Sequence, residues 1–484
     1  MKNDGTIGRG AKVALVSLGC PKNLVDLQVV ASALRGAGFD VGVPENDADA
    51  ILVNTCAFIE SAREEALAAI GEACARKGAP GAAKQGGGGA APAVVVAGCL
   101  AQRYRGQVLD ACPEVDAILG VDDLDRAPEI VRAAIDRAAA GGAAPALDAV
   151  SPGRSKKLFT AREPWFVLTP GPYAYLKAGE GCRHACAFCA IPGIRGRLRS
   201  RPVATLAAEA RALVAHGIRE LDVIAQDVTS YGMDLRDGTS LVSLLRALED
   251  LPGEFRVRLL YGHPARCTDE LLDFVAASRR VVPYFDIPVQ HASPEMLRLM
   301  DRRDTVAEVP RMAGRIRAKV PGAVLRTTCL VGFPGETDAM FEELLAFVRE
   351  TKFDHLGAFV FSPEEGTKAF SMPDPVPARV AESRRRRLMR AQAKVVAAKL
   401  DALAGAEATV LLETPPARRG GPWVGRTERQ APDDIDGVTF VRRVPASARP
   451  GDFLRVRYVG RTDYDLVAEM APGATSRSPR GSAR

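Results

Sequence analysis

The chain of 484 residues is long enough for about three domains of roughly 150 residues each. Hydrophobic residues make up 47% and charged residues 26%, the balance of an ordinary globular protein, which excludes a disordered or collagen-like chain. The formal net charge of +6 is too mild to demand a nucleic-acid partner. No apolar run reaches the roughly 18 residues of a membrane span, and no secretory signal follows the N-terminus. We therefore expect a cytoplasmic protein without a membrane segment.

Short apolar runs alternate with helical stretches in the first part of the chain, after a polar tail over residues 1–10. Such alternation predicts a doubly wound α/β domain with a parallel sheet, which we place at residues 11–127. The expected elements are strands at 13–18, 50–54 and 93–97, helices at 23–35 and up to about 77, and a loop at Gly86–Gly89. An Ala-, Gly-, Pro- and Ser-rich stretch then predicts a linker over 128–167.

A longer β/α series follows and predicts a partial (βα) barrel over residues 168–397. Its six expected strands are 173–178, 220–225, 256–260, 284–287, 325–330 and 356–361, and a basic helix over 378–400 ends it. Residues 400–470 are turn-rich, with expected strands at 408–412, 439–442 and 453–458, which suits a small β-barrel. We expect residues 471–484 to be a disordered tail.

The most specific motif is Gly181-Cys182-Arg-His-Ala-Cys186-Ala-Phe-Cys189, directly after a predicted strand. Thiolates suit iron–sulfur clusters and zinc. Structural zinc takes four protein ligands, and no nearby cysteine or well-placed histidine supplies the fourth. His184 lies between two of the cysteines and is interpreted as a loop residue. Three thiolates leave one iron of a 4Fe–4S cluster open to an external ligand. A zinc knuckle completed from elsewhere in the chain is the alternative.

This motif resembles the signature of the radical S-adenosylmethionine (SAM) superfamily. The resemblance implies that Cys182, Cys186 and Cys189 hold a 4Fe–4S cluster whose open iron binds SAM, and that reduction cleaves SAM to a 5′-deoxyadenosyl radical. It also suggests SAM contacts from residues beside the motif or near strand ends: Phe188, Gln226, Asp227, Arg258, Gln290 and Arg326. A purely structural role is the alternative for each of these six. No catalytic residue is assigned beyond the cluster ligands.

Three further cysteines, Cys20, Cys56 and Cys99, each follow a predicted parallel strand. The carboxyl ends of such strands share one edge of the sheet, where ligands bind. The sequence therefore predicts a converging three-thiolate site, with three buried small residues as the alternative. The remaining cysteines, at 74, 112, 267 and 329, have no such context and are interpreted as structural.

The order of the three predicted domains resembles the methylthiotransferase family over about residues 11–470, with a TRAM domain as the C-terminal barrel. The resemblance implies a second 4Fe–4S cluster on Cys20, Cys56 and Cys99, whose open iron carries the sulfur to be transferred. It implies a transferase of sulfur-containing groups that consumes two SAM per turnover. It also implies sulfide as sulfur source and a reductant such as flavodoxin or ferredoxin.

Several motifs resemble the RimO branch of that family, which acts on ribosomal protein; they are 19–26, 173–177, 191–196, 286–293 and 331–337. The branch implies a methylthio group added to the β-carbon of an aspartate in the twelfth protein of the small ribosomal subunit, free or assembled. The predicted barrel carries eleven acidic residues and ten arginines without lysine over 401–470. An RNA-binding barrel should be clearly basic, so direct RNA contact is secondary. The Arg384–Arg387 run lies on the basic helix instead, where a solvated face is the usual role and contact with ribosomal RNA of an assembled subunit is the alternative.

Three alternatives stay open at this point. The first is a transfer-RNA adenosine methylthiotransferase, which the motifs and the near-neutral barrel disfavour. The second is a zinc-stapled RNA-binding protein without radical chemistry, which would be colourless when purified. The third is a radical SAM enzyme of another type with a degenerate N-terminal cluster.

Overall fold

A computed structural model describes residues 10–77, 91–141, 145–151, 158 and 166–471. The glycine run at 86–89 and the tail from 472 on lie outside the described residues. The chain forms two compact units. The first holds the residues up to 168 with the segments 180–182 and 190–197, and the second holds 169–179, 183–189 and the chain from 198 on.

The first unit is built on a six-stranded parallel sheet in the order β2-β1-β3-β4-β5-β6. Its strands are β1 (Lys12–Ser17), β2 (Asp40–Val41), β3 (Ala50–Thr55), β4 (Ala93–Gly98), β5 (Ala117–Leu119) and β6 (Leu147–Ala149). Every residue of β3 and β4 is buried. Parallel strands covered on both faces need such continuous apolar runs, which is why the sequence pattern located them correctly.

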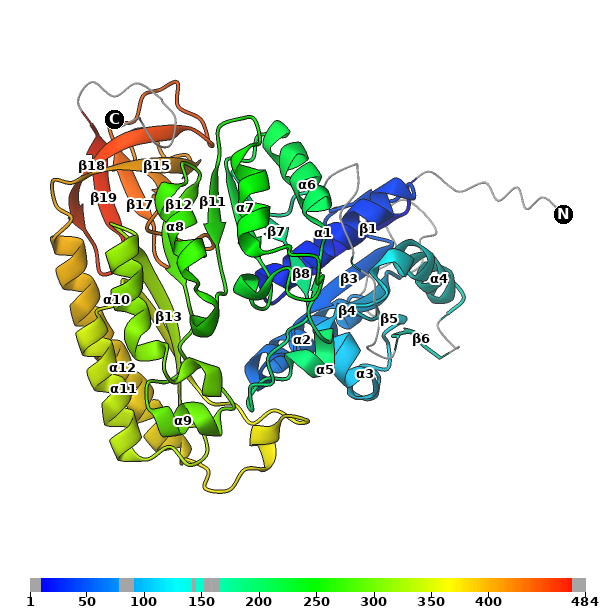
Figure 1. Cartoon of the computed structure of the whole chain (residues 1–484). Helices are drawn as coiled ribbons and strands as arrows, with labels where there is room; N and C mark the ends of the chain where they lie inside the picture. The colour runs from blue at the N-terminus through cyan, green and yellow to red at the C-terminus, as the bar shows by residue number, and fades with distance from the viewer. Residues whose placement is uncertain (1–9, 78–90, 142–144, 152–157, 159–165, 472–484) are drawn as a thin grey trace. The chain divides into compact units, whose positions relative to one another are not determined.

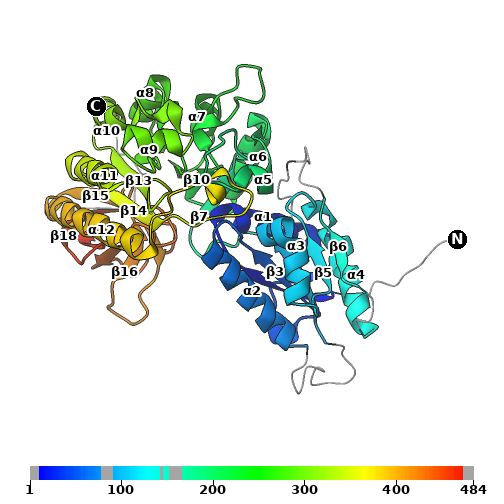
Figure 2. The same ribbon diagram turned by 90° about the horizontal axis from the view of Figure 1, so that it is seen from below.

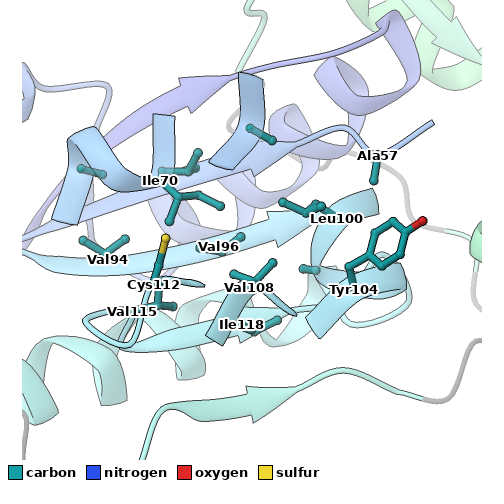
Figure 3. Packing of buried hydrophobic residues seen from close by; sticks show 14 of the residues in the cluster. Ala57, Ile70, Val94, Val96, Leu100, Tyr104, Val108, Cys112, Val115 and Ile118 are labelled. Carbon is teal, nitrogen blue, oxygen red and sulfur yellow. The ribbon is translucent and has the colours of Figure 1, made fainter. Parts of the chain in front are cut away.

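Helices cover both faces of this sheet. Two core clusters separate α2 (Glu60–Ala75) and α3 (Cys99–Ala111) on one face from α1 (Pro21–Gly36) and α4 (Ala127–Ala139) on the other. Figure 3 shows the α2/α3 cluster, in which Ile70, Leu100 and Val108 pack against the strand residues Val94, Val96 and Ile118. The short helix α5 (Ile191–Arg195) adds Ile194 to the same cluster.

The predicted linker over 128–167 is wrong in its first part. Helix α4 buries Ile130, Val131 and Ala134 against the sheet, and β6 pairs in parallel with β5. The composition concealed both elements, because alanine and glycine dominate the stretch and a strand of three residues shows no alternation. The N-terminal α/β domain therefore continues at least to Ala149.

The second unit contains a six-stranded parallel sheet in the order β14-β13-β12-β11-β10-β7. Its strands are β7 (Tyr173–Lys177), β10 (Glu220–Ile224), β11 (Arg256–Leu259), β12 (Val281–Asp286), β13 (Val324–Val331) and β14 (His355–Val360). These confirm the six predicted strands. The helices of this series are α6 (Val203–Ala215), α7 (Leu241–Glu249), α8 (Asp269–Ala277), α9 (Pro294–Leu299), α10 (Val309–Lys319) and α11 (Asp338–Thr351) (Figure 1). Two-residue strands β8 (Gly179–Glu180) and β9 (Arg199–Ser200) flank the cysteine loop.

The long helix α12 (Ala378–Asp401) packs beside α11 and β14 (Figure 2). The sequence favours a solvated face for the Arg384–Arg387 run, but only part of this run is exposed. Arg384 is buried and donates to the Glu336 carboxylate at 3.0 Å and to the Asp338 carboxylate at 2.7 Å. Arg387 pairs with Glu342 at 2.6 Å. The helix thus uses part of its positive charge to attach itself to α11.

The chain ends in a closed five-stranded barrel, β15-β16-β17-β19-β18. Its strands are β15 (Glu407–Thr414), β16 (Trp423–Arg426), β17 (Thr439–Arg442), β18 (Phe453–Arg461) and β19 (Leu466–Met470). Three were predicted, while β16 and β19 were missed. The barrel belongs to the same compact unit as the half-barrel, which is the six-stranded parallel sheet of β7 and β10–β14 with its helices. Among the described residues, no helix has the length and apolarity needed to cross a bilayer.

Candidate cluster sites

The first site lies at the carboxyl ends of three strands in the N-terminal sheet. Cys20 follows β1 and caps the start of α1, Cys56 follows β3, and Cys99 is the first residue of α3 after β4. No disulfide joins any of the ten cysteines, all of which the structure describes. Helix N-termini carry partial positive charge and favour thiolates, so Cys20 and Cys99 are well placed as ligands.

Asn23 joins these strand ends. Its Oδ1 accepts from the Cys99 thiol at 3.4 Å and lies 4.0 Å from the Cys20 Sγ. Its Nδ2 donates to the Thr55 carbonyl at 2.8 Å, and its own carbonyl accepts from the Asn54 side chain at 2.7 Å. The start of α1 is therefore tied to the end of β3, which places Cys20 and Cys99 near the strand end that Cys56 follows.

Two glycines permit this close approach. Gly19 has φ +96°, and a Cβ there would lie 2.7 Å from the Cys56 Cβ. Gly98 has φ +97° and ψ −155°, and a Cβ there would lie 2.6 Å from the Thr55 carbonyl oxygen. Only glycine fits such backbone positions without strain.

A fourth participant arrives from the segment 190–197. The Arg195 guanidinium is buried and donates through Nη2 to Asn23 Oδ1 at 2.6 Å, to Asp26 Oδ2 at 2.9 Å and to Cys99 Sγ at 3.3 Å. Through Nη1 it donates to both carboxylate oxygens of Glu180, at 3.0 and 3.1 Å. A cation of this kind compensates the charge that three thiolates would bring into a buried site.

The residues present fit an iron–sulfur cluster. Burial raises the pKa of the Cys99 thiol to about 12, although the charge of Arg195 opposes it. Burial likewise raises the pKa of Cys56, so protein surroundings alone do not ionise these thiols. A bound metal deprotonates its thiol ligands outright. Three sulfur donors with no fourth match a 4Fe–4S cluster with an open iron better than four-coordinate zinc.

The second site is the loop between β8 and α5, which carries Cys182, Cys186 and Cys189. The Cys189 N–H donates to the Cys186 carbonyl at 3.0 Å, and the Arg302 guanidinium approaches the Cys186 Sγ at 3.7 Å. Phe188 packs on an apolar cluster with Met296, Met300, Phe333, Met340 and Ala369. The aromatic residue before the third cysteine thus anchors the loop on the half-barrel.

Gln226 and Asp227 lie two and three residues after the end of β10, at the carboxyl edge of the half-barrel sheet. The Asp227 carboxylate accepts from His184 at 2.7 Å and from the Ser230 and Thr229 hydroxyls at 2.5 Å each. Burial raises the pKa of Asp227, but these hydrogen bonds outweigh it and lower the pKa to about 2. His184, expected to be an ordinary loop residue, thus ties the cysteine loop to this edge and stacks on His263 at 3.9 Å between ring centroids.

Gln290 also lies beyond the carboxyl end of its strand, β12, with φ +67°. Its backbone bridges to β13, since its N–H donates to the Thr328 carbonyl and its carbonyl accepts from the Leu330 N–H. Its half-buried side chain remains a candidate for ligand contact.

Arg258 and Arg326 do not fit their predicted role as SAM contacts. Arg258 is fully buried and donates to Glu220 at 3.0 Å and to the carbonyls of Thr427 and Glu428. Arg326 donates to Asp286 at 2.9 Å and to Asp436 at 3.2 Å. Both guanidiniums are committed to acidic partners and to the C-terminal barrel. Nearness to a strand end was an insufficient signal, because it does not say which way a long side chain turns.

Sequence reasoning missed several residues of the first site, namely Asn23, Asp26, Glu180 and Arg195. Asn23 was within reach, since an amide three residues after Cys20 lies on the first turn of the predicted helix. Arg195 carried no such signal, because it lies beyond the second cysteine motif in the chain. The cysteines outside the two sites are buried, at 8% exposed for Cys74 and Cys112 and 1% or less for Cys267 and Cys329.

Comparisons with known families match three segments. Residues 12–120 match the family described as Uncharacterized protein family UPF0004, residues 176–348 the Radical SAM superfamily and residues 404–471 the TRAM domain. The three segments follow the predicted order of domains.

Similar proteins cover nearly the whole chain. The ribosomal protein uS12 methylthiotransferase RimO of Pelotomaculum thermopropionicum is 42% identical over 95% of this chain and 99% of its own. The protein of the same name from Geotalea uraniireducens is 40% identical over 95% and 98%. Among solved structures, the radical SAM methyltransferase TsrM of Kitasatospora setae is similar with a TM-score of 0.52, at 16% identity over 72% of this chain and 73% of that one, which supports the fold alone.

Proposed function

Because the chain belongs to the family of the RimO ribosomal protein uS12 methylthiotransferases, we propose that it adds a methylthio group to the β-carbon of an aspartate in that ribosomal protein. The observation that carries the proposal is the gathering of Cys20, Cys56 and Cys99 at one edge of the N-terminal sheet, in a chain that also has a three-cysteine radical SAM loop. The proposed compartment is the cytoplasm, where the substrate is made.

We assign the ligands by site. Cys182, Cys186 and Cys189 would hold the cluster that binds SAM, with Phe188, Gln226, Asp227 and Gln290 as the remaining candidates for contact with SAM. Cys20, Cys56 and Cys99 would hold the second 4Fe–4S cluster. When bound, these groups supply the radical and the sulfur that substitution at an unactivated carbon requires, with two SAM per turnover, sulfide as sulfur source and electrons from a donor such as flavodoxin or ferredoxin.

The C-terminal barrel supports a protein substrate over RNA. Six of its ten arginines pair with carboxylates, namely Arg426, Arg429, Arg443, Arg455, Arg457 and Arg461. RNA binding rests largely on positive charge available to phosphates. We therefore place any contact with ribosomal RNA second to contact with the ribosomal protein, whether free or in the assembled subunit.

The decisive experiment supplies anaerobically reconstituted enzyme with SAM, sulfide and a reductant, and offers uS12 and transfer RNA in separate reactions. Mass spectrometry should find one methylthio group in place of one hydrogen on an aspartate of the protein. Modification of an adenosine instead would keep the chemistry and overturn the substrate.

Two triple variants test the ligand assignment in the same assay. C182A/C186A/C189A should abolish SAM cleavage. C20A/C56A/C99A should lose about half of the iron and all methylthio transfer while still cleaving SAM. Unchanged iron in the latter variant would remove the second cluster from the proposal.

A further inference from the structure

Arg195 lies in a segment that follows the second cysteine motif, yet its side chain belongs to the first site. Its backbone ends α5, and the buried Ile194 beside it packs on the α2/α3 face of the N-terminal sheet. This packing directs the next side chain to the carboxyl ends of β1, β3 and β4. The Arg195 side chain is 2% exposed, so its charge is stabilised by protein groups rather than by solvent.

The contacts of this guanidinium divide into two sides. On one side, Nη1 donates to both carboxylate oxygens of Glu180 and forms an ion pair with them. On the other, Nη2 is directed at Asp26, Asn23 and the sulfur of Cys99. A planar fork held this way on its carboxylates keeps a fixed orientation toward the sulfur, which a lysine ammonium on a flexible stem does not.

We propose that Arg195 is a positioning residue of the second cluster, the one that Cys20, Cys56 and Cys99 would hold at the first site. It orients Cys99 and, by donating to the Cys99 sulfur, favours the reduced state of that cluster. The inference rests on the proposed second cluster. Hydrogen bonds and positive charge at the sulfurs of a cluster stabilise the added electron and so raise its reduction potential.

The same residue connects the two cysteine motifs along the chain. Glu180 lies two residues before Cys182, and the Cys182 N–H donates to the carbonyl of Gly196, next to Arg195. The buried Arg195 side chain therefore contacts Cys99 of the first site, while the neighbouring Gly196 carbonyl accepts from the Cys182 N–H of the second site. This arrangement gives Arg195 a role that the ligand sets alone do not provide.

The test isolates the second cluster in the full-length C182A/C186A/C189A variant and measures its midpoint potential by EPR-monitored titration with dithionite. R195Q removes the charge and the fork, R195K keeps the charge only, and R197Q is the matched control, since Arg197 is exposed on the same segment. We expect R195Q to lower the equilibrium constant for one-electron reduction of the cluster about tenfold, which is a shift of the midpoint potential by about 59 mV to lower values. R195K should recover more than half of that shift and R197Q should show none.

A potential that is equal in R195Q and R197Q would overturn the inference. If R195Q fails to fold, the protein with Arg195 intact provides the test. Pulsed EPR of its reduced cluster, after labelling with nitrogen-15 arginine, should show a coupling to an arginine nitrogen. The absence of that coupling would reject the hydrogen bond to the Cys99 sulfur. If the C182A/C186A/C189A protein holds no cluster at all with Arg195 intact, the proposed second cluster fails instead, so the two failures are distinguishable.

Discussion

At the scale of single residues, the first site depends on two glycines, which have no side chain, as much as on its cysteines. Gly19 and Gly98 precede Cys20 and Cys99, and each occupies a backbone region with positive φ next to another strand end. The cysteine triad can converge only because the neighbouring backbones meet there without a Cβ between them. Asn23 then joins the strand ends by its hydrogen bonds to Thr55 and Asn54.

Replacing Gly98 by alanine should therefore damage the site directly. The backbone conformation and the approach to Thr55 predict a loss of roughly 1–3 kcal/mol in the free energy of unfolding, with less iron bound at the first site. Denaturant titration and iron analysis in the C182A/C186A/C189A protein measure both effects.

The control is Gly106→Ala in α3, the helix that begins directly after Gly98. A Cβ at Gly106 would have no atom within 4 Å outside its own helix backbone, and alanine favours helices by about 1 kcal/mol over glycine. G106A should be neutral or stabilising. Equal behaviour of G98A and G106A would show that the close approach at Gly98 does not matter.

At the scale of elements, the half-barrel has two different ends. Its carboxyl edge carries Asp227 and Gln290, while the first residues of β7, β10 and β11 are Tyr173, Glu220 and Arg256, which lie in register. Glu220 accepts from Arg256, from Arg258 at 3.0 Å and from Arg426 of the C-terminal barrel at 2.7 Å. Burial raises the pKa of Glu220, but the three guanidiniums outweigh it and hold the pKa well below its usual range.

Glu220→Gln should strongly destabilise the second unit, because it leaves three buried guanidiniums without their shared countercharge. We expect a loss of about 3–5 kcal/mol in the free energy of unfolding. Glu254→Gln is the control, since Glu254 is more than a third exposed and its ion pair with Arg219 contributes about 0–1 kcal/mol. Chemical denaturation that finds the two variants equally stable would contradict this account of the network.

At the scale of the whole molecule, the C-terminal barrel and the half-barrel form one compact unit. The Tyr173 hydroxyl donates to Asp433 at 2.5 Å, Tyr284 donates to Asp436, and the His355 ring contacts the Arg429 carbonyl at 2.8 Å. The barrel thus closes the amino end of the half-barrel, opposite the carboxyl edge. We therefore expect removal of the barrel to affect the stability of the half-barrel as well as substrate binding.

Deleting residues 401–484 should reduce soluble yield, thermal stability and iron content together, since the buried polar residues of β7, β10, β11 and β12 lose their partners. Truncation after Ala471 is the control, because every barrel contact named above lies before it. A 1–400 protein with normal iron and a normal unfolding midpoint would contradict this dependence of the half-barrel on the C-terminal barrel.

The sequence by itself determined β1, β3 and β4 of the first unit, all six strands of the half-barrel and the two cysteine sets, and it predicted that Cys20, Cys56 and Cys99 lie at one sheet edge. These follow from local rules: buried parallel strands are continuous apolar runs, and parallel strands end at the same edge. It misread the segment after Arg126, because an alanine-rich helix and a three-residue strand carry little periodic signal.

Only the tertiary structure decided which long polar side chains reach which site. Arg256 and Arg426 are 170 positions apart, and Arg195 and Asn23 are 172 apart, so no local pattern relates them. Strand alternation predicts the face that Arg258 or Arg326 occupies, but the partner on that face comes from the packing of distant elements. For that reason the cysteines were predictable from the sequence, while the arginine that contacts Cys99 and the arginines that hold the barrel were not.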